Sequence, residues 1–184
     1  MRCFLALDIP SPVRNYLARF ARESLTKGEV RWVGPEQMHV TLVFAGEIPG
    51  ATATALRDAL LDVDAWPMSF ALADLGHFPP RGEPRVVWAG LSGDTDELRR
   101  IQGLLAARAE QLGIEREKRP FSPHITLGRV KSSFGAYAIV DQLKEVGETL
   151  RGKPFETTTM TLYESELTPR GAVYRPVARR DLMA

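Results

Sequence analysis

One short pattern occurs twice in the chain and restricts the folds that the chain can adopt. The segments HVTLVFAGE, residues 39–47, and HITLGR, residues 124–129, share the order His, aliphatic, Thr, Leu, and their histidines are 124 − 39 = 85 residues apart. Both segments have the apolar and β-branched composition of a buried strand. A strand that recurs at a spacing of almost half the chain predicts two similar halves, each contributing one such strand.

The rest of the chain alternates between helical and extended patterns. Apolar residues at helical spacing predict helices over 12–27, 51–63, 94–112 and 136–149. Extended patterns predict strands at 2–8, 30–33 and 39–45, a hairpin of 68–78 with 85–91, and a second hairpin of 155–167 with 172–180. Because strands joined by short turns pair antiparallel, we expect an α+β fold with mainly antiparallel sheets.

Specific residues mark the ends of two of these helices. We expect Ser11 to be an N-cap, with Pro12 at the first helical position and Gly28 after the last turn. Asp94 and Glu97 have the spacing of a capping box at the start of the third helix.

The charge balance and the cysteine content exclude several classes of protein. Lys and Arg total 24 against 23 Asp and Glu, which argues against a protein that coats long nucleic acid but allows a small anionic ligand. The opening MRCFLALDIP is too short to be a signal peptide or a membrane span, so we expect a cytoplasmic protein without a membrane partner. The single cysteine, Cys3, excludes an internal disulfide and a cysteine-based zinc site, and we expect it to pack as a small apolar residue.

Strand alternation brings each histidine together with a threonine. Side chains on a strand point alternately to its two faces, so residues two apart share a face. The polar pairs are His39 with Thr41 and His124 with Thr126. By the same alternation, Val43 is expected on the polar face of the first strand and Phe44 on its core face.

Two imidazoles that converge on one phosphorus centre can act as an acid and a base. Their unperturbed pKa of about 6.5 makes both protonation states accessible near neutrality, and each proton transfer contributes roughly 10² to 10⁴ in rate. Threonine hydroxyls on the same face could hold the non-bridging phosphate oxygens. A lone histidine in an apolar strand is more often a core residue, but two matched copies favour function.

A metal site is the other functional interpretation of these histidines, and we rank it below metal-free catalysis. The chain has 3 histidines, and neither motif has an acidic or cysteine neighbour on its histidine face. The third histidine, His77, lies beside a predicted turn without a threonine partner, and we expect it to be a surface or loop residue. We therefore expect no metal and no cofactor.

Arg129, at the end of the second motif, is a candidate for neutralising a bound phosphate. Strict alternation, however, places Arg129 on the strand face opposite His124. Gly128 could resolve this conflict by permitting a bulge that turns the arginine side chain toward the histidine face.

At these residues the chain resembles the two-histidine (2H) phosphoesterase superfamily and, within it, the bacterial and archaeal RNA 2',3'-cyclic phosphodiesterases, also called 2'-5' RNA ligases. The similarity extends over RCFLALDIP, HVTLVFAGE, RVVWAGL, RPFSPHITLGR and LYESELTPRGAVY. It implies that residues 1–184 form a single bilobal catalytic domain of the 2H phosphoesterase fold. Two pseudo-symmetric lobes, each with one HxTx motif, would then face each other across a central cleft.

The resemblance also implies an activity and roles for the motif residues. The expected reaction is hydrolysis of the 2',3'-cyclic phosphate at RNA ends to a 2'-phosphate, with reversible joining of such an end to a 5'-hydroxyl in a 2'-5' linkage. His39 would be the proton donor to the departing 3'-oxygen and His124 the proton acceptor from water. Substrate-binding roles fall to Thr41, Thr126 and Arg129. The expected partner is an RNA with a cyclic phosphate terminus, bound by a monomer.

Two other functions stay open at this point. The first is a 2H enzyme that acts on another small cyclic phosphate, and the second is a non-catalytic module that binds RNA ends. Stacking on the terminal base is a role open to Phe4, Phe44 and Trp88, although core packing is the expected role of each.

Overall fold

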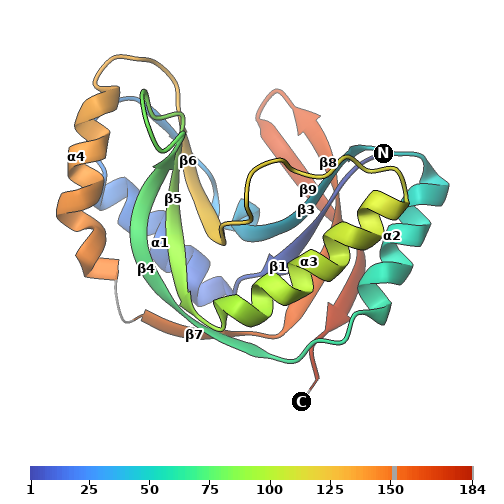
Figure 1. The fold of residues 1–184 in the computed structure, drawn as a ribbon. Helices are drawn as coiled ribbons and strands as arrows, with labels where there is room; N and C mark the ends of the chain where they lie inside the picture. The colour runs from blue at the N-terminus through green and yellow to red at the C-terminus, as the bar shows by residue number, and fades with distance from the viewer. Residues whose placement is uncertain (151–152, 184) are drawn as a thin grey trace.

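A curved antiparallel sheet, covered by helices, forms the frame of the molecule (Figure 1). The computed structural model describes residues 1–150 and 153–183. Its strands are β1 (Arg2–Asp8), β2 (Val30–Trp32), β3 (His39–Glu47), β4 (Met68–Phe78), β5 (Val86–Gly93), β6 (His124–Val130), β7 (Lys153–Thr157), β8 (Thr159–Thr168) and β9 (Gly171–Asp181). The α-helices are α1 (Ser11–Ser24), α2 (Gly50–Asp62), α3 (Thr95–Gln111) and α4 (Ala136–Gly147), with short 3₁₀ turns at Pro35–Gln37 and Glu148–Leu150. The predicted α+β class is confirmed.

The two motif strands lie at the centre of the sheet. The strand order is β7-β4-β5-β6-β3-β1-β8-β9, with β2 paired to the outer part of β6. β3 and β6 meet antiparallel through the pair Val40 and Ile125, both of which are buried in the core. Each motif strand is therefore the innermost strand of its half, and the two halves of the sheet join where the motifs begin.

Two of the helices cross between the halves of the sheet and tie them together. α1 follows β1 in sequence but packs beside β2 and β6, whereas α3 follows β5 but packs on β3 (Figure 1). α2 packs against α3, β8 and β9, and α4 packs on β4. The buried side chains form one continuous hydrophobic cluster, in which Cys3 is fully buried on β1 as expected. Apolar burial of this extent is the main stabilising contribution to the fold.

The start of α1 differs by one position from the prediction. Pro10 is the N-cap and Ser11 is already helical, because the Pro10 carbonyl accepts the first helical hydrogen bonds, including one from the Arg14 amide at 3.1 Å. Proline is compatible with this position since the first amides of a helix have no helical acceptor. The helix ends at Ser24, before Gly28, so the predicted end is also too long.

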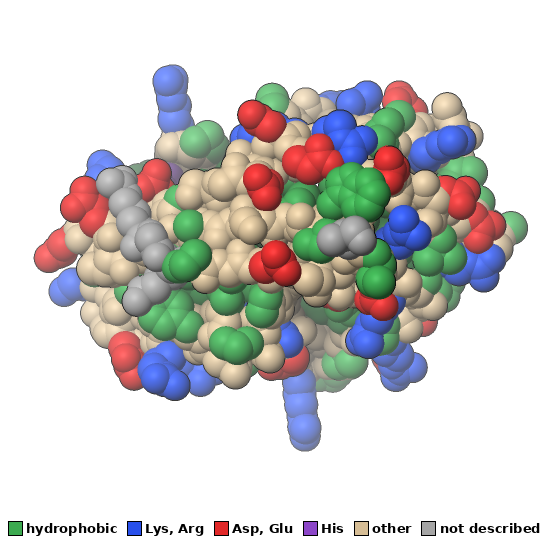
Figure 2. Space-filling model, turned by 90° about the horizontal axis from the view of Figure 1, so that it is seen from below, with side chains coloured by type: hydrophobic (Ala, Val, Ile, Leu, Met, Phe, Trp, Pro, Cys, Tyr) green, Lys and Arg blue, Asp and Glu red, His purple; other side chains and the backbone are tan. Residues whose placement is uncertain are grey.

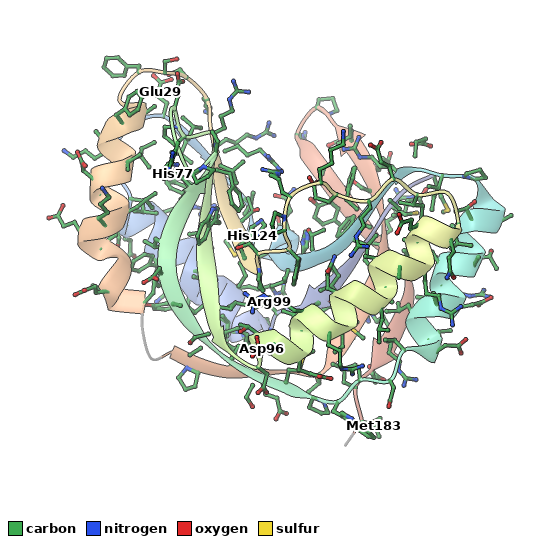
Figure 3. The ribbon with its side chains drawn as sticks, in the orientation of Figure 1. Glu29, His77, Asp96, Arg99, His124 and Met183 are labelled. Atoms are coloured by element: carbon green, nitrogen blue, oxygen red, sulfur yellow. The ribbon has the colours of Figure 1, made fainter. Side chains whose placement is uncertain are left out.

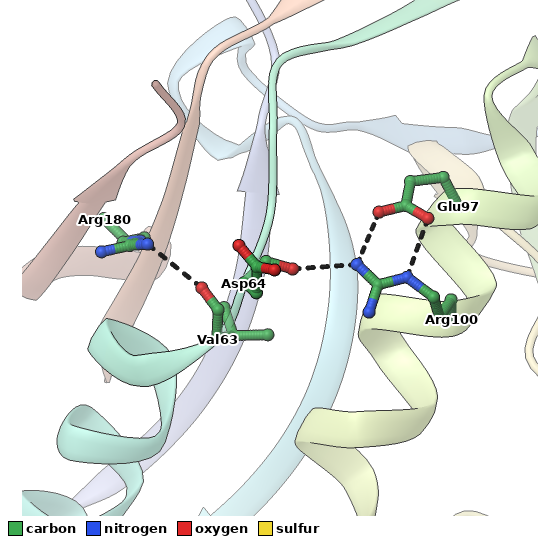
Figure 4. Close-up of polar contacts among 5 residues, drawn as sticks. All are labelled: Val63, Asp64, Glu97, Arg100 and Arg180. Carbon is green, nitrogen blue, oxygen red and sulfur yellow. Dashed lines mark hydrogen bonds and ion pairs between the residues drawn. The ribbon is translucent and has the colours of Figure 1, made fainter. Parts of the chain in front are cut away.

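The predicted capping box of α3 is absent from the structure. Asp94 is the N-cap, but its carboxylate accepts a hydrogen bond from the Ser69 amide of β4 at 2.8 Å instead of capping its own helix. Glu97 pairs with Arg100 one turn later at 2.6 Å (Figure 4). Tertiary partners thus replace the local pair that the spacing predicted.

Two arginines hold the segment that leaves α2. Arg100 of α3 donates a hydrogen bond to the Asp64 carbonyl at 2.9 Å, and Arg180 of β9 donates one to the Val63 carbonyl at 3.2 Å (Figure 4). Carbonyls after the last turn of a helix have no helical donor, so these guanidinium groups supply the missing partners. They also connect α2 to both neighbouring elements.

The C-terminal extended region is two strands rather than the one predicted over residues 155–167. β7 pairs with β4 in one half of the sheet, and β8 pairs with β1 and β9 in the other. Thr157 is buried at the end of β7, where its hydroxyl donates to the Met68 carbonyl at 3.3 Å. The chain passes from one half to the other directly after this residue. The predicted β8–β9 hairpin is confirmed.

The surface of the molecule shows no single dominant charge on the face drawn in Figure 2. Acidic and basic side chains are scattered there among apolar ones, in keeping with the formal net charge of +1. Positive charge for an anionic ligand must therefore be concentrated at a local site.

Of the helices in the described part of the chain, none combines the length and the apolar composition needed to cross a bilayer.

Candidate active site

The central pairing of β3 with β6 brings the two motifs together. Val40 and Ile125 point into the core, so the residues on either side of them point to the opposite face of the sheet. Extending the antiparallel register by one residue in each direction places each histidine across from the other motif's threonine. The resulting cross-strand pairs are His39 with Thr126 and Thr41 with His124.

Both histidines are held by the same type of backbone contact. His39 Nδ1 lies 2.8 Å from the Gln37 carbonyl, and His124 Nδ1 lies 2.7 Å from the Ser122 carbonyl, in each case two residues earlier. A carbonyl can only accept, so Nδ1 carries the proton in both rings and Nε2 of each neutral ring has a free lone pair. His39 Nε2 then accepts from the Thr41 hydroxyl at 3.0 Å. The reactive nitrogens are thus Nε2 in both motifs.

Burial lowers the pKa of both histidines. The pKa of His39 falls to about 4, chiefly because the ring is desolvated, with a smaller contribution from the nearby His124. Desolvation also lowers the pKa of His124, and the positive charge of Arg119 adds to the effect. Both rings are therefore predominantly neutral at neutral pH before an anion binds.

Aromatic rings pack around each histidine. Phe4 stacks on His39 with 4.8 Å between ring centroids, and Tyr174 meets the same imidazole edge-on at 5.5 Å. In the other half, Phe78 meets His124 edge-on at 4.9 Å. These rings account for the desolvation of the imidazoles and restrict their orientation.

A cavity of about 570 Å³ opens beside the second motif. Three predicted site residues, His124, Thr126 and Arg129, are among its lining residues. His39 and Thr41 are outside this lining, on the neighbouring strand. The cavity is large enough for a nucleotide-sized ligand.

A β-bulge explains how Arg129 reaches the face of His124. Two consecutive residues of β5 pair with Thr126 and Gly128, which are two positions apart on β6. Leu127, between them, is therefore the extra residue of the bulge. Leu127 and Gly128 are consecutively buried, after which Arg129 returns to the cavity face. The bulge suggested at Gly128 is therefore present. The placement of Arg129 on the face opposite His124, which strict alternation predicts, is wrong.

Glycine at the bulge also lets β2 approach β6. A Cβ atom at Gly128 would lie 2.6 Å from Cγ1 of Val30 and 2.7 Å from Cε3 of Trp32. These distances are shorter than van der Waals contact, so a larger residue would displace β2.

The first motif strand contains the same irregularity. Neighbouring residues of β1 pair with Thr41 and Val43, which leaves Leu42 as the extra residue on β3. Val43 is consequently buried, whereas Phe44 is 54% exposed. The predicted faces of Val43 and Phe44 are therefore wrong, and so is the expected core packing of Phe44, because a bulge reverses the alternation beyond it.

The third histidine lies apart from the site. His77 belongs to β4 rather than to a loop, which corrects the prediction, and it lies on the α4 side of the sheet while His124 lies near the centre of the molecule (Figure 3). Its Nδ1 is buried without a hydrogen-bond partner among the described residues.

Two arginines outside the motifs also line the cavity. Arg119 lies with its guanidinium over the Phe78 ring, 5.7 Å from the centroid, and Arg85 precedes β5. With Arg129, and against the single carboxylate of Glu83, they give the lining a net positive charge that the overall composition does not reveal. Arg119 could have been suspected from RPFSP before the second motif, whereas Arg85 becomes a neighbour only through the pairing of β5 with β6.

A partly buried carboxyl group lies beside the first motif. Asp8 of β1 pairs with His39 across the sheet, and its carboxylate accepts hydrogen bonds from Thr161 at 2.7 Å and Tyr163 at 2.8 Å. Burial raises the pKa of Asp8 and raises the pKa of Tyr163 to about 12. Within residues 1–150 and 153–183, no three His, Cys, Asp or Glu side chains are grouped so that they could hold a metal ion.

Comparison with known proteins places this geometry in a family. The protein-family model described as LigT like Phosphoesterase matches residues 7–88 and 90–174 of this chain. Two curated relatives are both named RNA 2',3'-cyclic phosphodiesterase. That of Archaeoglobus fulgidus is 31% identical over 95% of this chain and 97% of its own length, and that of Methanocaldococcus jannaschii is 32% identical over 96% and 98%.

A solved structure is similar throughout. The crystal structure of E. coli LigT complexed with 3'-AMP covers 100% of this chain and 98% of its own, with a TM-score of 0.82 and 26% identity. The family match includes both histidine motifs and the strands that join them. The chain therefore belongs to the LigT-like phosphoesterases of the two-histidine superfamily, as its paired motifs predict.

Proposed function

We propose that this protein hydrolyses the 2',3'-cyclic phosphate at RNA ends to a 2'-phosphate by general acid-base catalysis with two histidines. The observation that carries the proposal is the central β3–β6 register, which brings two histidines with similarly tethered Nδ1 atoms to one face of the sheet. The names of the curated relatives support the same reaction for this chain.

In the proposed reaction, each histidine acts through Nε2. His124 takes a proton from water as the water oxygen bonds to phosphorus, and His39 gives a proton to the 3'-oxygen as the phosphorus–O3' bond breaks. The product has a 3'-hydroxyl and a 2'-phosphate, and the proton balance is restored by exchange with solvent. His39 must first gain a proton on Nε2, which an approaching phosphate anion favours by raising its pKa.

The remaining predicted residues are proposed to bind the phosphate. The hydroxyls of Thr41 and Thr126 would donate to its non-bridging oxygens, and Arg129 would add a charge-assisted hydrogen bond from the cavity. Arg85 and Arg119 increase the positive potential there. These groups favour an anionic RNA end as the partner.

The same residues would support joining of RNA ends. A 5'-hydroxyl in place of water would lose its proton to His124 and form a 2'-5' phosphodiester, again with release of the 3'-oxygen. Since no phosphate bond beyond the cyclic ester is consumed, the step needs no ATP and is reversible.

The catalytic unit is proposed to be one copy of the chain. Both histidines come from adjacent strands of one sheet, so a monomer contains the complete acid-base pair. We infer that the two halves form a single catalytic domain over residues 1–184 and that it acts in the cytoplasm, where its one cysteine would remain reduced.

The function is tested by incubating the protein with an RNA that ends in a 2',3'-cyclic phosphate, without metal or ATP. The expected product is the 2'-phosphate, identified by comigration with a standard and by the position of its phosphorus resonance. A 3'-phosphate product, or much faster turnover of small cyclic nucleotides, would contradict the assignment. Binding without turnover would indicate an RNA-end binding module, and loss of activity with a chelator would indicate a metal enzyme.

The pH dependence is expected to reflect the lowered pKa values of the histidine pair. Turnover requires that one ring of the histidine pair carries a second proton, on Nε2, while the other ring is neutral. The pKa values of both histidines lie below the ordinary value of a histidine. Above about pH 6.5, kcat/KM is therefore expected to fall by about tenfold per pH unit. In kcat the falling limb should lie at higher pH, because the bound anion stabilises the imidazolium. A kcat/KM that is flat or rises from about pH 6.5 to about pH 8.5 would contradict this model.

A further inference from the structure

Arg31 of β2 lies in one row across the sheet with Arg129 and the wall of the cavity. Val86 of β5 pairs with Arg129 of β6, and Arg129 pairs with Arg31. Opposite residues of an antiparallel pair share a face of the sheet, and Val86 and Arg129 both line the cavity. Val30 and Trp32, on either side of Arg31, pack against the hydrophobic core. The exposed Arg31 side chain therefore continues the row beyond Arg129, on the side away from the cavity.

The turn between β8 and β9 brings the other half of the sheet next to Arg31. A Cβ atom at Gly171 would lie 3.1 Å from Nη2 of Arg31 and 3.7 Å from Nε2 of Gln37. Gln37 donates a hydrogen bond to the Ala172 carbonyl at 2.7 Å, which holds this turn against the segment that leads into β3. The Arg31 guanidinium therefore lies where the two halves of the sheet approach each other.

The charge of Arg129 acts in the same space. Burial raises the pKa of Tyr174, and the positive charge of Arg129 opposes this shift. Tyr174 meets His39 edge-on, so Arg129 is close enough to the first motif to influence a side chain there. The space between the halves is thus bordered by Arg129 and Arg31 from neighbouring strands.

These arginines are like charges without a neutralising carboxylate. Within the described part of the chain, no carboxylate forms an ion pair with Arg31 or Arg129, or with Arg170 in the β8–β9 turn. Like charges directly opposite each other destabilise a pair of strands. A bound anion with more than one negative group offsets this repulsion.

We propose that Arg31, beside Arg129, binds a second phosphate of the RNA, the one attached to the 5'-oxygen of the terminal nucleoside. This inference rests on the proposed function, in which Arg129 binds the reacting phosphate. The Cα atoms of opposite residues are about 5 Å apart, so the two long side chains can reach two phosphates that are separated by one ribose. A free nucleoside 2',3'-cyclic phosphate lacks the second phosphate. Arg31 therefore directs the protein to the ends of RNA chains.

The test compares the binding of two ligands by calorimetry in about 0.15 M salt, where attraction by more distant arginines is screened. The ligands are adenosine 2'-phosphate and adenosine 2',5'-bisphosphate, which differ only in the phosphate that Arg31 would bind. An exposed ion pair contributes up to about 1 kcal/mol, so the bisphosphate is expected to bind roughly fivefold more tightly. Arg31→Gln should bring this ratio close to one, and Arg31→Lys should retain most of it.

Arg19, an exposed arginine of α1, provides a matched control. Arg19→Gln removes the same charge from the protein and should keep the wild-type ratio of affinities. A wild-type ratio near one, or an unchanged ratio in Arg31→Gln, overturns the second phosphate site. Thermal melting of Arg31→Gln and the ratio in Arg31→Lys separate loss of the charge from loss of folding.

The same samples distinguish failure of this inference from failure of the proposed function. Hydrolysis of a cyclic RNA end by the wild-type protein, with an affinity ratio near one, overturns only the second phosphate site. A high ratio that depends on Arg31, without hydrolysis, supports the site and overturns the proposed activity.

Discussion

Replacement of either motif histidine by alanine is expected to lower kcat for cyclic phosphate hydrolysis by about 10² to 10⁴. His39→Ala removes the Nε2 that would protonate the leaving oxygen, and His124→Ala removes the Nε2 that would deprotonate water. RNA ends should still bind to both variants, because the arginines of the cavity are retained. The measurements are single-turnover kinetics with an RNA that ends in a 2',3'-cyclic phosphate and equilibrium binding of the 2'-phosphate product.

His77→Ala is the matched control, because this third histidine lies on β4 outside the cavity lining. It should retain wild-type kcat. Groups that act as one catalytic unit are strongly non-additive, so the double variant His39→Ala/His124→Ala should be little slower than the slower single variant. Near wild-type turnover in either single variant would rule out the paired acid-base mechanism.

Loss of the Arg129 charge is expected to have the second largest effect. A hydrogen bond to a charged group contributes about 1.5–3 kcal/mol, so Arg129→Gln should lower kcat/KM by roughly 10- to 150-fold. Arg129→Lys should recover part of this loss, since lysine retains the charge but not the bidentate geometry. Steady-state kinetics at several salt concentrations should also show a weaker salt dependence in Arg129→Gln than in the wild type.

Arg22→Gln is the control for Arg129. Arg22 lies exposed in the last turn of α1, outside the cavity lining, and its replacement removes the same charge from the protein. This variant should keep the wild-type kcat/KM. An Arg129→Gln variant that behaves like Arg22→Gln would contradict the placement of Arg129 at the phosphate.

Much of the fold follows from local patterns in the sequence. The helical periodicity over 94–112 and the extended patterns at 2–8 and 39–45 correspond to α3, β1 and β3, with ends displaced by a few residues. Local signals were misleading where a distant partner competed. The carboxylate of Asp94 binds the Ser69 amide of β4 instead of capping α3, and residues 155–167 divide into two strands because their partners lie in different halves of the sheet.

The sequence by itself determined the repeated His-x-Thr pattern, and with it the residues on which the proposed chemistry depends. Alternation along a strand is a local property, so it correctly paired His39 with Thr41 and His124 with Thr126. Only the tertiary structure decided where Phe44 and Arg129 point. A bulge exists through the pairing of one strand with its neighbour, and β1 and β5 impose one extra residue on β3 and β6 directly after each threonine.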